Sequence, residues 1–156
     1  MNMTRVLGAG LLASIVMGMV EMVFEAGAGP GFWSPLVFIA ATVLRRLQSV
    51  PTPVPFMALP VVLGLMGHMM NSMILGLVFG VIFSRFAVGR GALVGAGVAY
   101  ALVVFAMTWY LVLPAIDPVM LKLNAGFFAI AHVMWGAALG LTMPEPAERA
   151  RRLTTA

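Results

Sequence analysis

Four apolar stretches, each long enough to cross a lipid bilayer as a helix, constrain the fold of this chain more than any other feature. They lie at about 6–26, 58–84, 91–113 and 124–143. A helix needs roughly 20 residues to cross a hydrocarbon core of about 30 Å, and only helices or closed barrels satisfy their backbone hydrogen bonds there. We therefore predict an all-α integral membrane protein, a four-helix bundle forming one transmembrane domain over residues 1–156, with a short cytoplasmic tail at 144–156.

The composition excludes most other classes of protein. Hydrophobic residues make up 62% of the chain and charged residues only 9%, whereas a typical soluble chain carries about 25% charged residues. The absence of cysteine excludes disulfides and cysteine-bound zinc or iron–sulfur clusters. The basic residues are scattered rather than gathered on one face, so we expect no binding to nucleic acid. No catalytic triad, paired-carboxylate site or nucleotide motif is present, and we expect no enzymatic activity.

The first stretch also resembles a cleavable secretory signal, because Arg5 precedes it and Ala26, Gly27 and Ala28 follow it. A signal is normally shorter and carries no acidic residue, whereas this stretch contains Glu21 near its end. We expect the segment to be retained as the first helix of the bundle.

The positively charged residues predict the topology. With four spans, Lys and Arg divide six to three between the two sides. The larger group is Arg5, Arg85, Arg90, Arg149, Arg151 and Arg152, and the smaller group is Arg45, Arg46 and Lys122. Because Lys and Arg accumulate on the cytoplasmic side, both termini are predicted to be cytoplasmic. A further crossing by 31–48 would divide the charges four to five, without useful bias.

The segment at about 35–48 is predicted to form a short interfacial or re-entrant helix. Its apolar run covers 35–44 and is followed by Arg45 and Arg46. Ten helical residues rise only about 15 Å, which is half the thickness of the membrane. Between the last two spans, Asp117 is expected to be a helix N-cap at the membrane surface.

The two halves of the sequence are similar to each other. His68 and His132 are each followed, at the same spacing, by the sequence Leu-Gly-Leu, and the preceding spans both contain Gly-Ala-Gly near their start. This internal repeat predicts two tandem helical hairpins related by a pseudo-two-fold axis along the membrane normal.

Glycines spaced four residues apart predict close helix packing, because small residues allow two backbones to approach in lipid. The second span carries Gly64, Gly76 and Gly80 in the same column as His68 and Ser72. The fourth span carries Gly136 and Gly140 in the column of His132. We expect these two helices to face each other across the axis, with both histidines near the centre of the molecule.

Ionisable residues inside a bilayer are costly and are functional candidates by default. Counting residues along the helices places Glu21, His68 and His132 at similar depth, with Asn71 and Ser72 one turn from His68. These residues come from three helices, and we expect them to form one buried polar cluster.

Four interpretations of this cluster remain open. The first is structural: a hydrogen-bonded network that fixes helix register without chemistry. The second is a path for protons or ions, since histidine titrates near neutrality. The third is a b-type haem bound by the two imidazoles of His68 and His132, although helices that touch through glycine leave little room for a porphyrin. The fourth is a metal ion bound by His68, His132 and Glu21.

The turn with Gly31, Trp33 and Pro35 after the first span, and Ala131 with His132 in the last span, resemble small bacterial inner-membrane proteins. The resemblance implies a location in the bacterial plasma membrane, and it brings no substrate, cofactor or catalytic residue to carry over. We expect a non-enzymatic accessory or assembly subunit, or a small homo-oligomer, in contact with lipid and other membrane subunits. The alternative is an electron- or ion-handling protein that uses His68 and His132.

Overall fold

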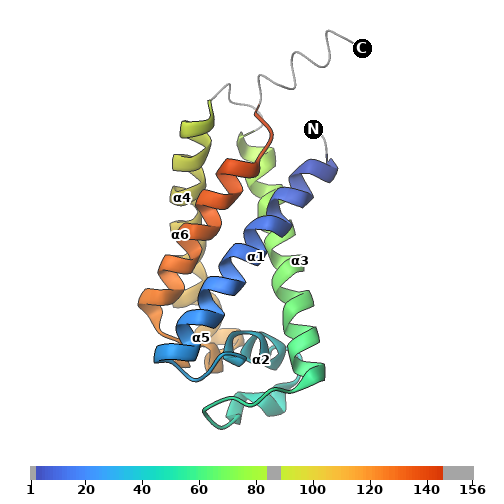
Figure 1. Cartoon of the computed structure of the whole chain (residues 1–156), viewed down its shortest axis with the longest axis vertical. Coiled ribbons are helices and arrows are strands. Elements are labelled where there is room, and N and C mark those ends of the chain that lie inside the picture. Colours follow the sequence, from blue (N-terminus) through green and yellow to red (C-terminus); the bar gives the residue numbers. More distant parts are fainter. Residues whose placement is uncertain (1–2, 84–88, 146–156) are drawn as a thin grey trace.

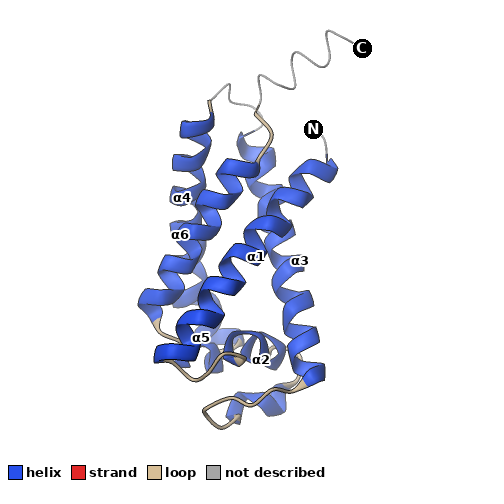
Figure 2. Ribbon diagram, viewed as in Figure 1, coloured by secondary structure: helices blue, strands red, loops and turns tan. Residues whose placement is uncertain are grey.

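The computed structural model describes residues 3–83 and 89–145, and all regular secondary structure in these residues is helical (Figures 1 and 2). The elements are α1 (Met3–Ala28), α2 (Ser34–Ala41), η1 (Arg45–Ser49), α3 (Ala58–Phe83), α4 (Arg90–Met107), η2 (Thr108–Val112), α5 (Leu113–Ile116), η3 (Pro118–Lys122) and α6 (Ala125–Thr142). Four helical segments are long and apolar enough to span a membrane: α1, α3, the continuous segment Arg90–Ile116, and α6. For this part of the chain, the prediction of an all-helical fold with four such helices is confirmed.

The ends of the long helices are set by local sequence. After α1, the backbone amide of Gly31 donates to the carbonyl of Glu25 at 3.0 Å. Gly31 has a φ of +113°, a conformation that glycine adopts readily and other residues avoid. At the start of α6, the side chain of Asn124 accepts hydrogen bonds from the amides of Gly126 and Phe127 at 2.9 and 3.2 Å. Such a cap satisfies amides that have no partner within the helix.

The long helices alternate in direction (Figure 1). α1 and α4 run away from the end where α1 begins and α6 ends, and α3 and α6 return to it. We call the end where α1 begins and α6 ends the terminal end. The opposite end, which carries α2, η1, α5 and η3, is called the connector end. α4 packs along α6, and α1 packs along both α3 and α6.

The helix contacts do not follow a two-fold axis. Such an axis would make the contact of α1 with α6 equivalent to that of α3 with α4, but the first is extensive and the second is marginal. Bulky rings fill the space between α3 and α4, where the centroids of Phe79 and Tyr100 lie 5.5 Å apart. The hydroxyl of Tyr100 donates to the carbonyl of Leu75 at 3.1 Å across this space.

The short segment predicted at about 35–48 forms α2 and η1. α2 lies across the connector end of the bundle (Figure 1), and Val37, Phe38 and Ala41 are fully buried. It packs mainly on α3, with further contacts to α1 and η3. Its apolar side chains therefore fill the space where the long helices diverge.

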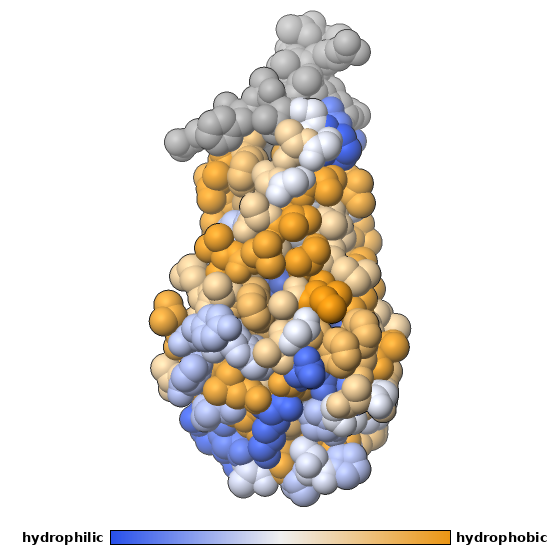
Figure 3. All heavy atoms as spheres, turned by 90° about the vertical axis from the view of Figure 1, so that its left-hand side faces the viewer, coloured by the Kyte–Doolittle hydropathy of each residue, from blue (hydrophilic) through white to orange (hydrophobic). Residues whose placement is uncertain are grey.

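The outer surface of the described bundle is strongly apolar. Figure 3 shows one side of the molecule, on which apolar residues cover the middle and hydrophilic residues gather at the connector end. Large hydrophobic side chains are exposed on every long helix, including Leu12, Met70, Val103 and Ile130. Soluble monomers rarely expose contiguous apolar surface of this extent.

Candidate functional site

The glycine columns face other helices than the sequence predicted. A Cβ placed on Gly76 would lie 3.0 Å from the Cα of Gly10 in α1, and one on Gly80 would lie 2.9 Å from the side chain of Val6. A Cβ on Gly64 would collide with the backbone of Leu36 in α2. The column of α3 therefore packs against the backbone or side chains of α1 and α2, and α6 reaches it only through the side chain of Leu139, with Met143 just beyond the end of α6.

The glycine column of α6 packs on α4. A Cβ on Gly136 would collide with the carbonyl of Gly97, and one on Gly140 would lie 2.6 Å from the Cα of Val94. The expectation that α3 and α6 face each other through glycine is therefore wrong. The physical reason is that α1 and α4 carry small residues of their own, at Gly10 and Gly97, which match these columns within each half of the chain.

Ser72 is the point where three helices are joined by hydrogen bonds. Its hydroxyl donates to the carbonyl of Gly10 at 2.7 Å and accepts from the indole nitrogen of Trp135 at 2.7 Å. Ser72 and Trp135 are almost fully buried. The bonds link α3 to α1 and α6, and satisfy polar groups that would be costly to bury alone.

His68 is held against α1. Its Nε2 lies 3.0 Å from the carbonyl oxygen of Ser14. Because a carbonyl oxygen only accepts, Nε2 carries the hydrogen, and in the neutral imidazole Nδ1 is then an acceptor. Gly18 lies beside the ring, and a Cβ there would make an ordinary van der Waals contact with Nε2 at 3.4 Å.

His132 is held within its own helix. Its Nδ1 donates to the carbonyl of Phe128 at 2.8 Å, and the ring packs edge-on against the rings of Phe128 and Phe105. The side chain is buried. His132 and His68 are close enough to interact electrostatically.

Glu21 is the unusual member of the cluster. Its side chain is only 3% exposed, and neither carboxyl oxygen has a hydrogen-bond partner among the described residues. Glu25, one turn further along α1, is also buried, but one of its oxygens accepts from the backbone amide of Asn124 at 3.1 Å. A buried carboxyl group with no partner is rare in folded proteins and calls for a physical explanation.

A small cavity adjoins Glu21. Its volume is about 20 Å³, and a cavity of roughly 10–15 Å³ on this measure already holds one water molecule. The lining consists of Met17, Gly18, Glu21, Pro35, Leu36, Ile39, His68, Met120 and Phe128.

The structure therefore brings Glu21 and His68 together at this cavity, with Ser72 one turn away on α3. His132 is nearby but does not line it. Asn71 is exposed on the outer face of α3 and is not part of the cluster. Its displacement follows from helix geometry, because the residue next to Ser72 points about 100° away from it.

The geometry does not fit the cofactors considered from the sequence. Among the described residues, no group of three or more His, Asp or Glu side chains could hold a metal ion, so Glu21, His68 and His132 do not form a ligand set. The cavity between α1, α2 and α3 has space for a water molecule and not for a porphyrin.

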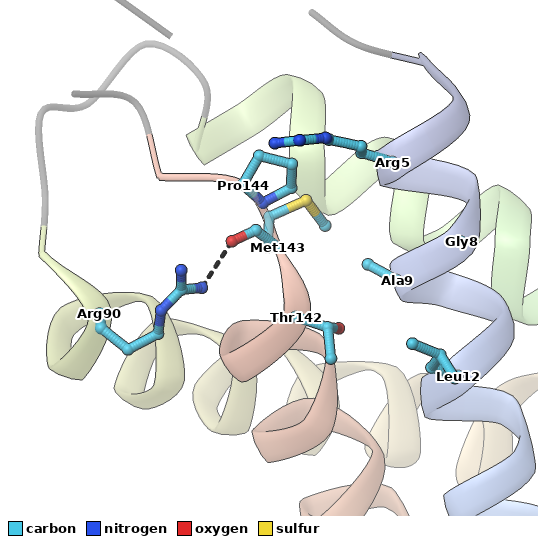
Figure 4. A pocket seen from close by; sticks show the side chains of 8 residues that line it. All are labelled: Arg5, Gly8, Ala9, Leu12, Arg90, Thr142, Met143 and Pro144. Atoms are coloured by element: carbon cyan, nitrogen blue, oxygen red, sulfur yellow. Dashed lines mark hydrogen bonds between the residues drawn. The ribbon is translucent and has the colours of Figure 1, made fainter. Parts of the chain in front are cut away.

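A second, larger cavity opens at the terminal end, between α1, α4 and α6 (Figure 4). Its volume is about 340 Å³, and its lining includes Arg5 and Arg90. Nη1 of Arg90 donates to the carbonyls of Leu141 and Met143 at 2.9 and 2.6 Å. Arg90 thus satisfies the last carbonyls of α6, which have no partner within the helix.

A polar network at the connector end was not predicted from the sequence. The Asp117 carboxylate accepts hydrogen bonds from Thr42, at 2.8 Å, and from Gln48. The amide of Val119 donates to Gln48, and Arg45 donates to the carbonyl of Ile116.

Asp117 precedes η3, as expected, but its side chain makes no capping hydrogen bond there. Burial raises the pKa of this carboxyl group above its ordinary value, while the hydrogen bonds from Thr42 and Gln48 and the charge of Arg45 act in the opposite direction. The network fixes α2 and η1 to α5 and η3. Its only sequence signal was the presence of polar residues beside the two short connecting helices.

Comparisons with known proteins identify no relative of this chain. No protein-family model, no curated protein and no solved structure matches the chain.

Proposed function

We propose that this protein is a non-enzymatic integral membrane protein of the bacterial plasma membrane that self-associates through α4 and acts as an accessory or assembly subunit. Its four apolar helices and the exposed hydrophobic side chains between the hydrophilic ends support insertion into a bilayer. The six-to-three division of Lys and Arg supports a cytoplasmic terminal end. Of these residues, Arg85, Arg149, Arg151 and Arg152 lie outside the described part of the chain.

The observation that carries the proposal is a stripe of small residues on the outer face of α4, formed by Gly91, Gly95 and Ala99. All three are exposed. A Cβ added to Gly91 or Gly95 would meet no atom within 4 Å, whereas Gly97 on the same helix packs against Gly136. Glycine in an open helix position costs roughly 0.8–1.0 kcal/mol relative to alanine, and nothing within the described bundle offsets this cost.

Self-association would offset the cost of placing glycine at these open helix positions. Between helices in lipid there is no hydrophobic driving force, and small residues four positions apart allow two backbones to approach closely. A single stripe is sufficient for a dimer, because a two-fold axis brings the same patch of both subunits together. We propose that Gly91, Gly95 and Ala99 of α4 meet the same residues of a second copy.

The hydrogen bonds of polar side chains within the bundle support a non-enzymatic role. Ser72, His68 and Tyr100 each bond to a backbone carbonyl of a neighbouring helix. These bonds support a role of the three side chains in fixing the register of the helices. The haem and metal forms of the alternative function lack a fitting site among the described residues.

The proposal is tested by measuring self-association of the purified protein in lipid nanodiscs or mild detergent, by fluorescence energy transfer between labelled copies. Gly95→Leu is expected to weaken association roughly ten- to a hundredfold, corresponding to about 1–3 kcal/mol of overpacking. Gly27→Leu is the matched control, because Gly27 lies at the end of α1 and is equally open. It is expected to associate as the wild type does.

Two results would contradict the proposal. One is a wild-type protein that remains monomeric at all protein-to-lipid ratios, and the other is a Gly95→Leu variant that associates as strongly as the wild type. The accessory role is contradicted separately if the protein alone moves an ion or solute across liposome membranes.

A further inference from the structure

The cavity at the terminal end of the bundle has no part in the proposed self-association, because none of Gly91, Gly95 and Ala99 lines it. Its volume of about 340 Å³ lies within the range of roughly 300–1,000 Å³ that is typical of small-ligand sites. The cavity is therefore large enough to receive part of a ligand, and its lining indicates the chemistry of that ligand.

The charged side chains that line this cavity are both cationic. Figure 4 shows Arg5 and Arg90 extending from α1 and α4 toward Met143 and Pro144. Arg5 is exposed, and Nε of Arg90 lies 3.2 Å from the carboxylate of Glu145. Within the described ranges 3–83 and 89–145, Glu145 is the one acidic residue at this end, and it does not line the cavity. This lining favours an anionic ligand.

The wall of the cavity on α1 changes from cationic to apolar along the helix. Arg5, Gly8, Ala9 and Leu12 line it, and their spacing of three, four and seven residues places them on one helix face. Leu12 lies about 10 Å further along α1 than Arg5 and is 53% exposed. A Cβ on Gly8, between them, would meet no atom within 4 Å. The wall therefore suits a molecule with an anionic group at one end and an apolar chain at the other.

We propose that this cavity binds an anionic phospholipid, with its phosphate group between Arg5 and Arg90 and an acyl chain along Leu12. Guanidinium groups match the geometry of phosphate oxygens. Basic pockets between transmembrane helices on the cytoplasmic side are typical sites for anionic headgroups. A free phosphate ion would use the two arginines but not the apolar wall, which favours the lipid. The inference rests on the membrane insertion and cytoplasmic terminal end of the proposed function, and not on self-association through α4.

Native mass spectrometry of the full-length protein in detergent tests this site. Phosphatidylglycerol and zwitterionic phosphatidylcholine with the same acyl chains are added separately, and the wild type is expected to bind phosphatidylglycerol at least fivefold more tightly. Arg5→Gln should lower the affinity for phosphatidylglycerol about fivefold, which is the effect of one cation at a membrane surface. Arg46→Gln is the matched control, because it removes the same charge from an exposed position at the connector end. It should bind phosphatidylglycerol as the wild type does.

A second variant fills the cavity without changing its charge. Gly8→Leu places a side chain on the cavity face of α1 and should weaken the binding of phosphatidylglycerol. Gly27→Leu, at an equally open position at the other end of α1, should leave this binding unchanged. Inorganic phosphate, added at millimolar concentration to the wild type, should not displace the lipid.

Three results would overturn the proposal. The wild type could bind both lipids equally, Arg5→Gln and Arg46→Gln could weaken the binding of phosphatidylglycerol equally, or inorganic phosphate could displace the lipid, which would indicate a site for a soluble anion. The measured mass also gives the number of subunits in each complex. A monomer that selects phosphatidylglycerol contradicts only self-association, whereas a dimer without this preference contradicts only the lipid site.

Discussion

At the scale of single residues, the absence of a side chain determines which helices touch. Gly10 and Gly76 bring α1 and α3 together, and Gly97 and Gly136 bring α4 and α6 together. At each position a methyl group would meet backbone atoms, which cannot move aside as a flexible side chain can. A methyl group added to an outward-facing glycine of the same helices would meet no neighbouring atom. Replacing glycine by alanine is therefore expected to have opposite effects on stability at the two kinds of position.

Gly10→Ala and Gly8→Ala form such a pair on α1. The added Cβ at position 10 would lie 2.9 Å from the carbonyl oxygen of Ser72, whereas at position 8 it meets no atom within 4 Å. We expect Gly10→Ala to lower the free energy of unfolding by about 1–3 kcal/mol. Gly8→Ala is expected to raise it by up to about 1 kcal/mol, because alanine favours the helix.

Unfolding in mixed detergent micelles, followed by circular dichroism, measures both effects. Equal stability changes for the two variants would show that α1 does not approach α3 as closely as Gly10 and Gly76 indicate.

At the scale of elements, α2 and the connector network have the greatest effect on the shape of the bundle. α2 is too short to cross a membrane, and its buried face fills the space between α1 and α3 at the connector end. Asp117, Thr42 and Gln48 then fix this helix to the connection between α4 and α6. The two halves of the chain are thereby joined at a place where their long helices diverge.

The pH dependence of stability reports on this network. Because the pKa of Asp117 is raised by burial, the folded state holds this proton at pH values where the unfolded state has lost it. Stability then falls as pH rises from the ordinary pKa of an aspartate to the raised one, and is constant above it.

Asp117→Asn removes this titration. Thermal unfolding measured from about pH 4 upward should therefore show a less steep loss of stability with pH in the variant than in the wild type. Parallel pH profiles for the two proteins would mean that Asp117 does not carry the raised pKa, and circular dichroism at each pH confirms that both remain helical.

The elements themselves could be predicted from sequence better than their contacts. Length and hydropathy predict four helices, because the bilayer sets a minimum length and excludes unpaired backbone groups. The partners of the glycine columns could not be predicted, since α1, α3, α4 and α6 all carry small residues and any two columns are compatible. The repeat suggested that α3 pairs symmetrically with α6. Two features disfavour this pairing: the small face of α1 at Gly10, and the bulk of Tyr100 and Phe79 between α3 and α4.

The candidate site could likewise be predicted only in part, because the sequence indicates the helices but not which of their faces meet. Counting residues from the helix ends gives the depth of a side chain and placed Glu21 and His68 at similar depth; both line the small cavity. The rotation of each helix about its axis is not given by depth, and it decides that Asn71 faces outward. The Asp117 network depends on contacts between residues about 70 positions apart, which a local pattern does not reveal.

At the scale of the whole molecule, the proposed self-association places the stripe of Gly91, Gly95 and Ala99 on α4 against a second copy. The internal glycine seams are already occupied by partners within the chain, whereas this stripe is not. The natural sequence contains no cysteine, so a single introduced cysteine reports contact between copies without interference.

Cysteine cross-linking in native membranes tests this claim most directly. With Ala99→Cys, mild oxidation is expected to convert most of the protein into a disulfide-linked dimer, because the proposed interface brings the two α4 helices together at this stripe. Val62→Cys, at an exposed position on α3, serves as the control and should remain monomeric under the same oxidation. Cross-linking of Val62→Cys but not of Ala99→Cys, or of neither, would contradict an α4 interface.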